Sequence, residues 1–549
     1  MTSARIAKAG GLAAFFALAY GPIVALGWAA ARFVVRSPAA AATMLPTMRT
    51  WPILARSVGF AAAVSASAMV LGVLIVTGLW RLRRGAKASR ASRALWAVLA
   101  LAGVPPYVHA LAWTSTMTAV SALGVAGAGR RIPFTGLYAA GWVSTLALLP
   151  LAVALALVAL EHVPRTLREA GQLERPDGAV LRWIVLPLAA PTLLMGGALL
   201  FLITVLDYSV TSLYQVTLYA LEIFVAFSEK NEAAAAALSA VPLMVVCAVV
   251  VAGMARLMPR AMQAPERGGM SPGWRPQWPA GLRRAQGIAL VVLAAAVIVP
   301  FVSLTRLAAV SPAALETLAK TTDEIVYSLA VALSACLVAL PPALAAALWL
   351  HDRPRSSVAW FAACLPLAFP SSLIGIGLIT AFNTPVMPLH GTSAMPVLAG
   401  VARVAPLLAL LLFAQRSRLD PALLDAGRVF QTSPWHGARR VLLPLMLPGF
   451  VAAAAVGFVL TLGELGATLI VAPPGRATLT MRIYTYLHFG ASDSVAVLCL
   501  VLLLAALAAG AVAAAAVGAM WGDKGDAGVA DVDGAGAVGD VDDAGQAGA

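Results

Sequence analysis

The chain has 549 residues, of which 61% are hydrophobic and only 11% are charged, and its formal net charge is +14. This composition excludes an ordinary soluble globular protein. The basic residues lie in short connections between apolar runs and not on one face of a soluble domain, so the positive charge does not indicate a nucleic-acid-binding protein.

The apolar residues come in runs of about 20, the length of helix that crosses a hydrocarbon core about 30 Å thick. We therefore expect an all-α, polytopic membrane protein. The first run is longer than the core of a signal peptide, and we expect it to remain as the first membrane helix. The twelve expected spans are 11–34, 57–80, 94–114, 136–160, 187–206, 234–255, 287–306, 326–350, 358–381, 396–414, 444–470 and 493–520.

The distribution of Lys and Arg predicts the orientation of these spans. If the N-terminus is inside, 26 of the 38 basic residues fall in the connections and ends on the inner side. Inner loops of membrane proteins carry an excess of positive charge, so we expect both termini in the cytoplasm. Arg130 and Arg131 would lie outside, against this rule.

A shift of 257 residues aligns the two halves of the chain. It takes Leu186-Pro187 to Leu443-Pro444 and Asp207 to Glu464. We expect two related helical domains, 57–255 and 326–520, that run parallel about an axis along the membrane normal. The other expected segments are a first helix and outer loop (1–56), a cytoplasmic linker (256–286), a helix and outer loop (287–325) and a disordered acidic tail (521–549).

Each half contains the same polar loop, in which an acidic-Ala-Gly triplet precedes basic residues and a Leu-Pro pair. Glu169-Ala170-Gly171 leads to Pro187, and Asp425-Ala426-Gly427 leads to Pro444. We expect a helix along the cytoplasmic surface with its acid near the positive N-terminal end, and a span that begins at the Leu-Pro pair. The small residues would let another protein surface approach. These could also be ordinary basic inner loops, but their duplication at matching positions favours the first interpretation.

A second repeated feature follows each loop, where an apolar span ends in an acidic residue. An acidic side chain is costly in lipid and usually faces a cavity or a partner. The two acids would then face each other and line the solute pathway or a gate. The alternative is that both acids simply end their helices at the outer surface. The candidate pathway residues are Thr204, Asp207, Tyr208, Thr461 and Glu464.

These motifs resemble the permease subunits of binding-protein-dependent ABC importers, whose signature is a cytoplasmic Glu-Ala-Ala, a nearby Gly and a downstream Leu-Pro. The second copy keeps the family spacing of 19 residues from Asp425 to Pro444, and the first copy is one residue shorter. The stretch from Gly463 to Tyr484 also resembles the fused, two-repeat permeases of iron(III) importers, whose relatives carry thiamine or phosphonates.

The resemblance implies a translocation subunit of the bacterial inner membrane. Each loop would be a coupling helix that binds one of two ATPase subunits, and a periplasmic or surface solute-binding protein would deliver iron(III), thiamine or a phosphonate-like solute. The chain has no Gly-x-x-x-x-Gly-Lys-Ser/Thr motif, so ATP hydrolysis is expected on a partner.

Other functions receive little support from the sequence. The six histidines have no metal-ligand spacing, and no catalytic residue, metal or cofactor is expected. An ion-coupled secondary transporter with six-plus-six helices remains an alternative, but it would need charged relay residues deep in the spans, where few acids occur. A membrane scaffold or sensor that transports nothing is a further alternative.

Overall fold

A computed structural model describes residues 2–82, 104–122, 134–161, 163–230, 232–262, 276–311, 314–384, 387–420, 422–425, 434–488 and 492–522. The predicted acidic tail from residue 523 on, much of the predicted linker, and Ala426 and Gly427 lie outside these residues.

The described residues form helices, apart from one short hairpin and the connecting loops. Ten of these helices are long and apolar enough to cross a membrane. Helices suit this environment because their backbone groups are satisfied within the segment. An all-α polytopic membrane protein is thus confirmed, and the expected number of twelve spans is approximate. The expected span 358–381 is two helices bent by 92°, and 444–470 ends as a helix at Leu462.

The N-terminal half of the chain combines long helices with short ones. In chain order they are α1 (Thr2–Arg36), α2 (Pro38–Ala42), α3 (Thr50–Leu82), α5 (Pro106–Ala122), α6 (Gly136–Glu161), α7 (Arg165–Glu174), α8 (Asp177–Val180), the π-helical turn η2 (Leu181–Val185), α9 (Leu186–Leu206), α10 (Ser209–Leu213), α11 (Tyr219–Lys230) and α12 (Ala233–Met262).

The C-terminal half repeats this order. Its elements are α13 (Ala280–Val310), α14 (Ala314–Lys320), α15 (Thr322–His351), α16 (Ser357–Cys364), the 3-10 turn η3 (Leu365–Ala368), α17 (Ser371–Phe382), the antiparallel strands β1 (Asn383–Thr384) and β2 (Met387–Pro388), α18 (Ala394–Arg418), α20 (Pro434–Gly437), the π-helical turn η4 (Ala438–Leu442), α21 (Leu443–Leu462), α22 (Thr468–Val471), α23 (Leu479–His488) and α24 (Ser492–Gly522).

The repeat extends to single hydrogen bonds. The hydroxyl of Ser57 on α3 accepts a bond of 2.8 Å from the backbone N–H of Tyr219, the first residue of α11. In the other half, the hydroxyl of Ser328 on α15 accepts a bond of 2.6 Å from the N–H of Leu479, the first residue of α23. Because the first N–H groups of a helix have no partner inside it, these serines satisfy them from a neighbouring span.

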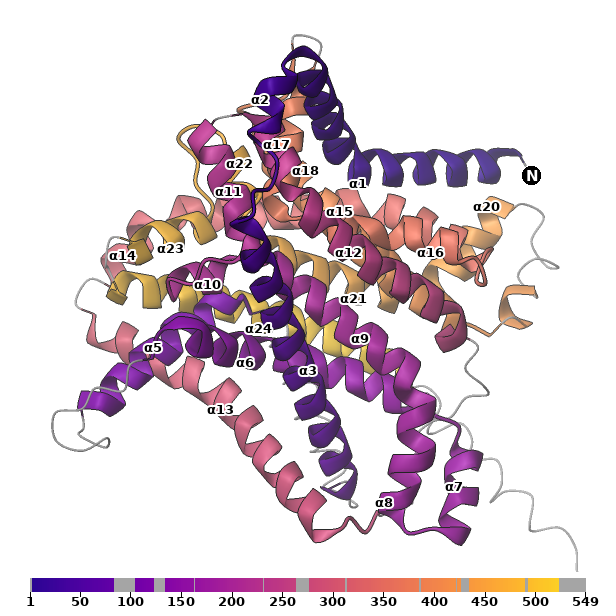
Figure 1. The fold of residues 1–549 in the computed structure, drawn as a ribbon. Helices are drawn as coiled ribbons and strands as arrows, with labels where there is room; N and C mark the ends of the chain where they lie inside the picture. Colours follow the sequence, from indigo (N-terminus) through magenta and orange to yellow (C-terminus); the bar gives the residue numbers. More distant parts are fainter. Residues whose placement is uncertain are drawn as a thin grey trace, which may run out of the picture.

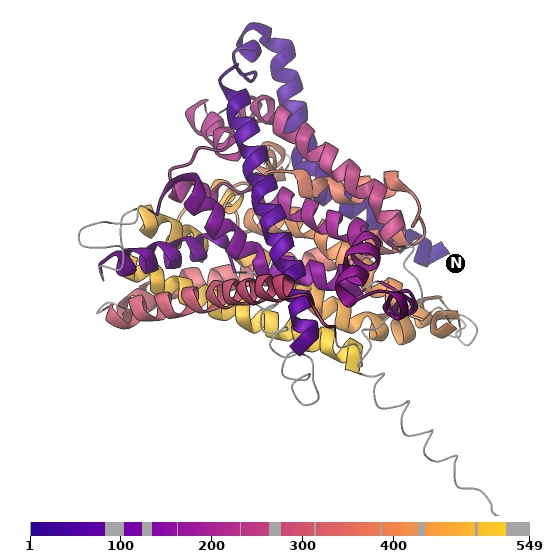
Figure 2. The ribbon, with the colours of Figure 1, turned by 60° about the horizontal axis from the view of Figure 1, so that its bottom comes forward.

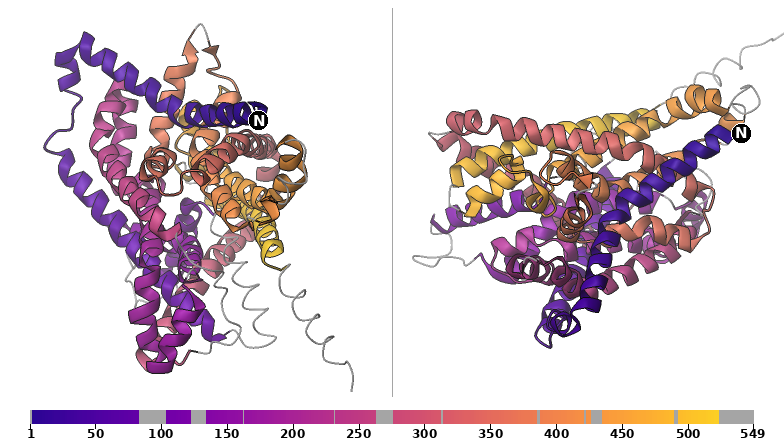
Figure 3. Two further views of the ribbon diagram at one scale, coloured as in Figure 1. Left: turned by 90° about the vertical axis from the view of Figure 1, so that its right-hand side faces the viewer. Right: turned by 90° about the horizontal axis from the view of Figure 1, so that it is seen from above.

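The first helix of each half packs against the opposite half. Helix α1 contacts α15, α17 and α18, and α13 contacts the corresponding α3, α5 and α6. Figure 2 shows α13 crossing α3 and running beside α24, and Figure 3 shows α1 lying across the orange elements of the C-terminal half. Gly377 of α17 makes the α1 crossing possible, because a Cβ there would lie 2.1 Å from the carbonyl oxygen of Pro22.

The short helices divide between two ends of the bundle. Figure 1 shows α7 and α8 together at one end, away from α10, α11, α22 and α23. The long helices between them include α9 and α21, which pack against α3 and α15, respectively. The two repeated sequence motifs therefore lie at opposite ends of the same long helices.

Candidate functional site

The first acidic-Ala-Gly triplet lies in the middle of α7. Glu169 is the fifth residue of this ten-residue helix, and the first turn holds no acidic residue. Asp425 is the last described residue of a helical turn over 422–425. The expectation that each acid lies near a helix start is therefore wrong for Glu169, whereas Asp425 lies in the first turn of the helix described from Ala422 on. Glu169, Ala170 and Asp425 are all exposed.

Gly171 has a role inside the chain. A Cβ at this position would lie 2.4 Å from Cδ1 of Ile184, a residue of η2. Its small size thus lets α7 pack on η2 within the chain. Leu167 of the same helix is exposed, and Leu173 is 88% exposed.

The α-helices α9 and α21 begin at their Leu-Pro pairs, as expected, but each continues a π-helical turn without a break. The first helix runs unbroken from Asp177 to Leu206, with η2 immediately before Leu186-Pro187. The second has η4 immediately before Leu443-Pro444, at the same shift of 257 residues. A proline inside an α-helix lacks an N–H and clashes with the carbonyl four residues earlier. The wider π-turn accommodates it, which explains why both turns occur there.

Hydrogen bonds hold the first loop against the segment that leads into α13. Asp177 accepts from Nε2 of Gln172 on α7 at 3.0 Å and from the backbone N–H of Gln277 at 2.6 Å. The next residue, Trp278, is buried and donates its indole N–H to the carbonyl of Thr77 at the end of α3, at 3.2 Å. Helices α3, α7, α8 and α13 are therefore joined at this end of the protein.

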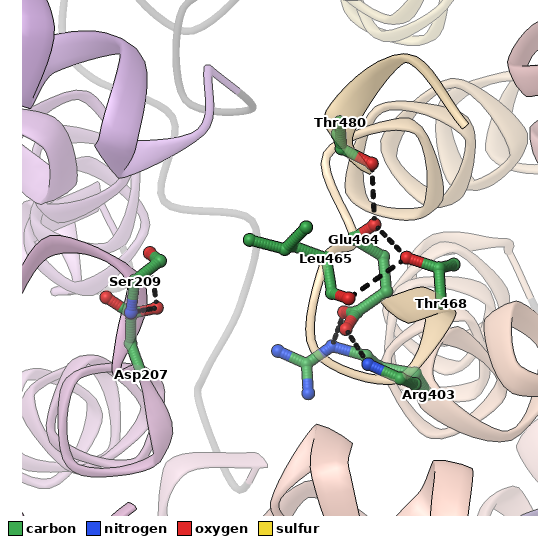
Figure 4. A network of polar contacts seen from close by, with 8 residues as sticks. Asp207, Ser209, Arg403, Glu464, Leu465, Thr468 and Thr480 are labelled. Carbon is green, nitrogen blue, oxygen red and sulfur yellow. Dashed lines mark hydrogen bonds and ion pairs between the residues drawn. The ribbon is translucent and has the colours of Figure 1, made fainter. Parts of the chain in front are cut away.

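At the other end, Glu464 follows α21 in a buried turn and is 6% exposed. Its Oε2 lies 2.5 Å from Nε of Arg403 on α18, and its Oε1 accepts the backbone N–H of Ala467 at 3.0 Å. Its carbonyl accepts hydrogen bonds from the hydroxyls of Thr468 and Thr480. Figure 4 shows this network beside the corresponding turn of the other half.

Asp207 has the equivalent local role in the N-terminal half. Its Oδ1 accepts the backbone N–H of Ser209 at 3.2 Å and the Ser209 hydroxyl at 2.7 Å. Each acid thus satisfies backbone near the start of the short helix that follows, α10 or α22. Asp207 is half-buried, and Glu464 is buried. Burial of Glu464 argues against an acid that merely ends its helix at an open surface.

The remaining predicted pathway residues surround these acids. Thr204 is buried, donates its hydroxyl to the carbonyl of Leu200, and lines a small pocket with Asp207. Thr461 is buried against Gly400 of α18, where a Cβ would lie 2.7 Å from its methyl group. Tyr208 is buried, and its ring stacks on that of Phe224 with 5.6 Å between the ring centroids.

The turn around Glu464 also contacts the N-terminal half. A Cβ on Gly463 would lie 2.7 Å from Cγ of Pro105, and one on Gly466 would lie 3.4 Å from Cε1 of Tyr208. A second small pocket spans the same boundary, with Tyr107 and Ser209 on one side and Leu465 and Tyr484 on the other. The acidic turns therefore meet at the interface between the two halves.

Arg403 was not among the predicted site residues. The signal that could have identified it is a single basic residue in the middle of an apolar span. Its side chain is 39% exposed and interacts electrostatically with Asp207 and Tyr208 as well as pairing with Glu464. A basic residue of one half thus lies among acidic and aromatic residues of both halves.

Comparison with known proteins identifies relatives for part of the chain. Over 182 residues it is 30% identical to proteins of Salmonella paratyphi A and Salmonella typhimurium named as 2-aminoethylphosphonate transport system permease protein PhnV, covering 33% of this chain and 69% of each relative. Over 191 residues it is 30% identical to the molybdenum transport system permease protein ModB of Haemophilus influenzae, covering 32% of this chain and 83% of that relative.

No family model matches the chain, and no solved structure matches it. The aligned residues make up a third of this chain but most of each relative, so each relative is roughly half as long as this chain. This agrees with two repeats in one chain. Together with the helical membrane fold, the similarity establishes that the chain belongs to the permeases of binding-protein-dependent ABC importers.

Proposed function

We propose that this chain is the translocation subunit of an importer that moves a small solute from the periplasm to the cytoplasm. Two ATPase subunits supply the energy, and a periplasmic or surface binding protein delivers the solute. The observation that carries the proposal is the duplicated unit of loop, π-turn and span, repeated at 257 residues within one chain. Two such units support two ATPase contacts on one polypeptide.

The first contact is α7, with Glu169, Ala170 and the exposed Leu167 and Leu173 facing the ATPase. The second is the loop around Asp425, where Leu423 is also exposed. Both loops and both termini are on the cytoplasmic side in this proposal, in agreement with the excess of basic residues there.

The long helices transmit motion from these loops to the acidic turns. The helix from Asp177 to Leu206 has 30 residues, so it is about 45 Å long. It starts beside α7 and ends next to Asp207, and the second long helix ends next to Glu464. ATP-driven closure of the ATPase subunits would move the cytoplasmic ends, and the two halves would rock between inward-open and outward-open states.

Among iron(III), thiamine and phosphonate-like solutes, a phosphonate-like solute fits best. The terminal nitrogens of Arg403 can pair with a phosphonate oxyanion, which iron(III) and thiamine, as cations, do not offer. The relatives named for 2-aminoethylphosphonate transport favour the same choice. Family membership favours an ATP-driven importer over an ion-coupled secondary transporter.

The test is to purify the tagged chain in mild detergent, identify the proteins that copurify, and measure ATPase activity and uptake in proteoliposomes. We expect two ATPase copies per chain. Glu169→Lys and Asp425→Lys should lower uptake while the protein folds and the ATPase still hydrolyses ATP. Glu229→Lys, at an exposed acid of α11, is the control and should transport normally. Normal uptake in both loop variants, or a chain that binds no ATPase under crosslinking, would contradict the proposal.

A further inference from the structure

Arg403 is a charged residue in the middle of an apolar span, and only one nitrogen of its guanidinium is paired with a described residue. Its Nε pairs with Glu464, but within the described residues neither terminal nitrogen of the guanidinium has a hydrogen-bond partner. The side chain is 39% exposed. Figure 4 shows these terminal nitrogens projecting from the C-terminal half toward the side on which Asp207 lies. A basic residue at this depth is costly unless it faces a partner or a hydrated pathway.

The two halves differ at this position. The repeat shift of 257 residues takes Arg403 to Leu146, a buried apolar residue of α6. Each half keeps its acid, but only the C-terminal half adds a cation. Asp207 thus brings a carboxylate from the N-terminal half, and Arg403 brings a guanidinium from the C-terminal half, to the proposed pathway. Packing within each half does not require this charge, because the N-terminal half has a buried leucine at the corresponding position.

The charges in this group select for one class of solute. Glu464 balances the charge of Arg403, and the carboxylate of Asp207 adds a negative charge. A solute that is only anionic would be attracted to Arg403 but repelled by both acids. A solute that is only cationic could pair with Asp207 but would leave the terminal nitrogens of Arg403 without an oxyanion. A small molecule with both an oxyanion and an amine offers each side an opposite charge.

We propose that Arg403 and Asp207 bind the transported solute across the interface of the two halves, and that this solute is a small zwitterion with an oxyanion group and a protonated amine. The terminal nitrogens of Arg403 bind the oxyanion, because the planar guanidinium matches two oxygens of such a group. The Asp207 carboxylate, whose Oδ1 accepts from Ser209, binds the amine. Glu464 is a positioning residue that holds Nε. This inference rests on the proposed importer function.

The test measures equilibrium binding to the permease–ATPase complex in nanodiscs, without the binding protein, so that the permease alone sets the preference. The probes are radiolabelled 2-aminoethylphosphonate, which is zwitterionic, ethylphosphonate, which lacks the amine, and thiamine. We expect the wild type to bind 2-aminoethylphosphonate at least tenfold more tightly than ethylphosphonate. Loss of a charge-assisted hydrogen bond weakens binding by about ten- to a hundredfold, and Arg403→Gln should weaken both phosphonates by this factor.

Two further variants separate binding from folding. Arg403→Lys keeps the charge and should restore part of the affinity that Arg403→Gln loses. Asp207→Asn should weaken only 2-aminoethylphosphonate, so that the two phosphonates bind about equally. Arg482→Gln removes a different arginine, which pairs with Glu324 on α15, and should leave both affinities unchanged.

Three outcomes would overturn the inference. These are wild-type affinity in Arg403→Gln, equal binding of the two phosphonates to the wild type, and binding of thiamine alone or of no probe by a complex with intact ATPase activity. Failure of the chain to assemble with an ATPase would instead contradict the proposed importer function, so the two failures can be told apart.

Discussion

The crossing of α1 over α17 predicts a large effect from the smallest possible substitution, Gly377→Ala. The new Cβ would lie 2.1 Å from the carbonyl oxygen of Pro22 and 2.6 Å from its carbonyl carbon. Such atoms do not approach closer than 3.0 Å, so the two helices must separate by about 1 Å. The obstacle is backbone, which cannot move aside as a flexible side chain can. Overpacking of this kind costs about 1–3 kcal/mol.

Gly197→Ala is the matched control, because it is also glycine to alanine inside an apolar helix but no atom lies within 4 Å of the new Cβ. Alanine favours a helix over glycine by about 1 kcal/mol, so this variant should be as stable as the wild type or slightly more stable. The assay is thermal unfolding of both variants in the same detergent. The reasoning would be refuted if Gly377→Ala unfolded at or above the temperature of Gly197→Ala.

Three further predictions concern single contacts. Glu464→Ala removes both the partner of Arg403 and the acceptor of the Ala467 N–H, and should cost about 1–3 kcal/mol; the double variant Arg403→Met/Glu464→Met should unfold at a higher temperature than Glu464→Ala, and a lower one would contradict the pairing. Asp177→Ala removes the acceptor of the Gln277 N–H and should speed hydrogen exchange in residues 276–286, while unchanged exchange would show that the segment is held otherwise. Ser328→Ala leaves the first N–H of α23 unsatisfied and should cost about 1–3 kcal/mol in thermal unfolding, with an unchanged midpoint as the opposing result.

The sequence predicted the arrangement of the repeat better than the local geometry of its loops. The shift from Pro187 to Pro444 could be read directly, and both prolines follow a π-turn at this shift. The turn itself has no sequence signal, because it arises where a proline must fit into an already continuous helix. The position of Glu169 was predicted wrongly, since α7 begins at Arg165 without a side-chain cap that could be recognised.

The role of Arg403 depends on tertiary contacts that a sequence pattern does not reveal. Its partner Glu464 is on a different element and is brought to it by the packing of α18 against α21. Gly171 is a similar case, because its smallness suggested a docking surface and its neighbour Ile184 becomes apparent only in the fold. Periodicity predicts which segments are helices, but not which faces of two helices meet.

The exchanged first helices have a consequence for biosynthesis. Helix α1 leaves the ribosome first, but its main contacts are with α15 and α17, and α15 begins roughly 290 residues later. At about 5–20 residues per second, α1 waits about 15 to 60 s for that part of the chain. During this interval it has α12 of its own half as a neighbour but lacks α15 and α17. Insertion of this protein into the bilayer and assembly of its two halves are therefore separate events in time, and a ribosome that stops early in the second half leaves the first helix without these two neighbours.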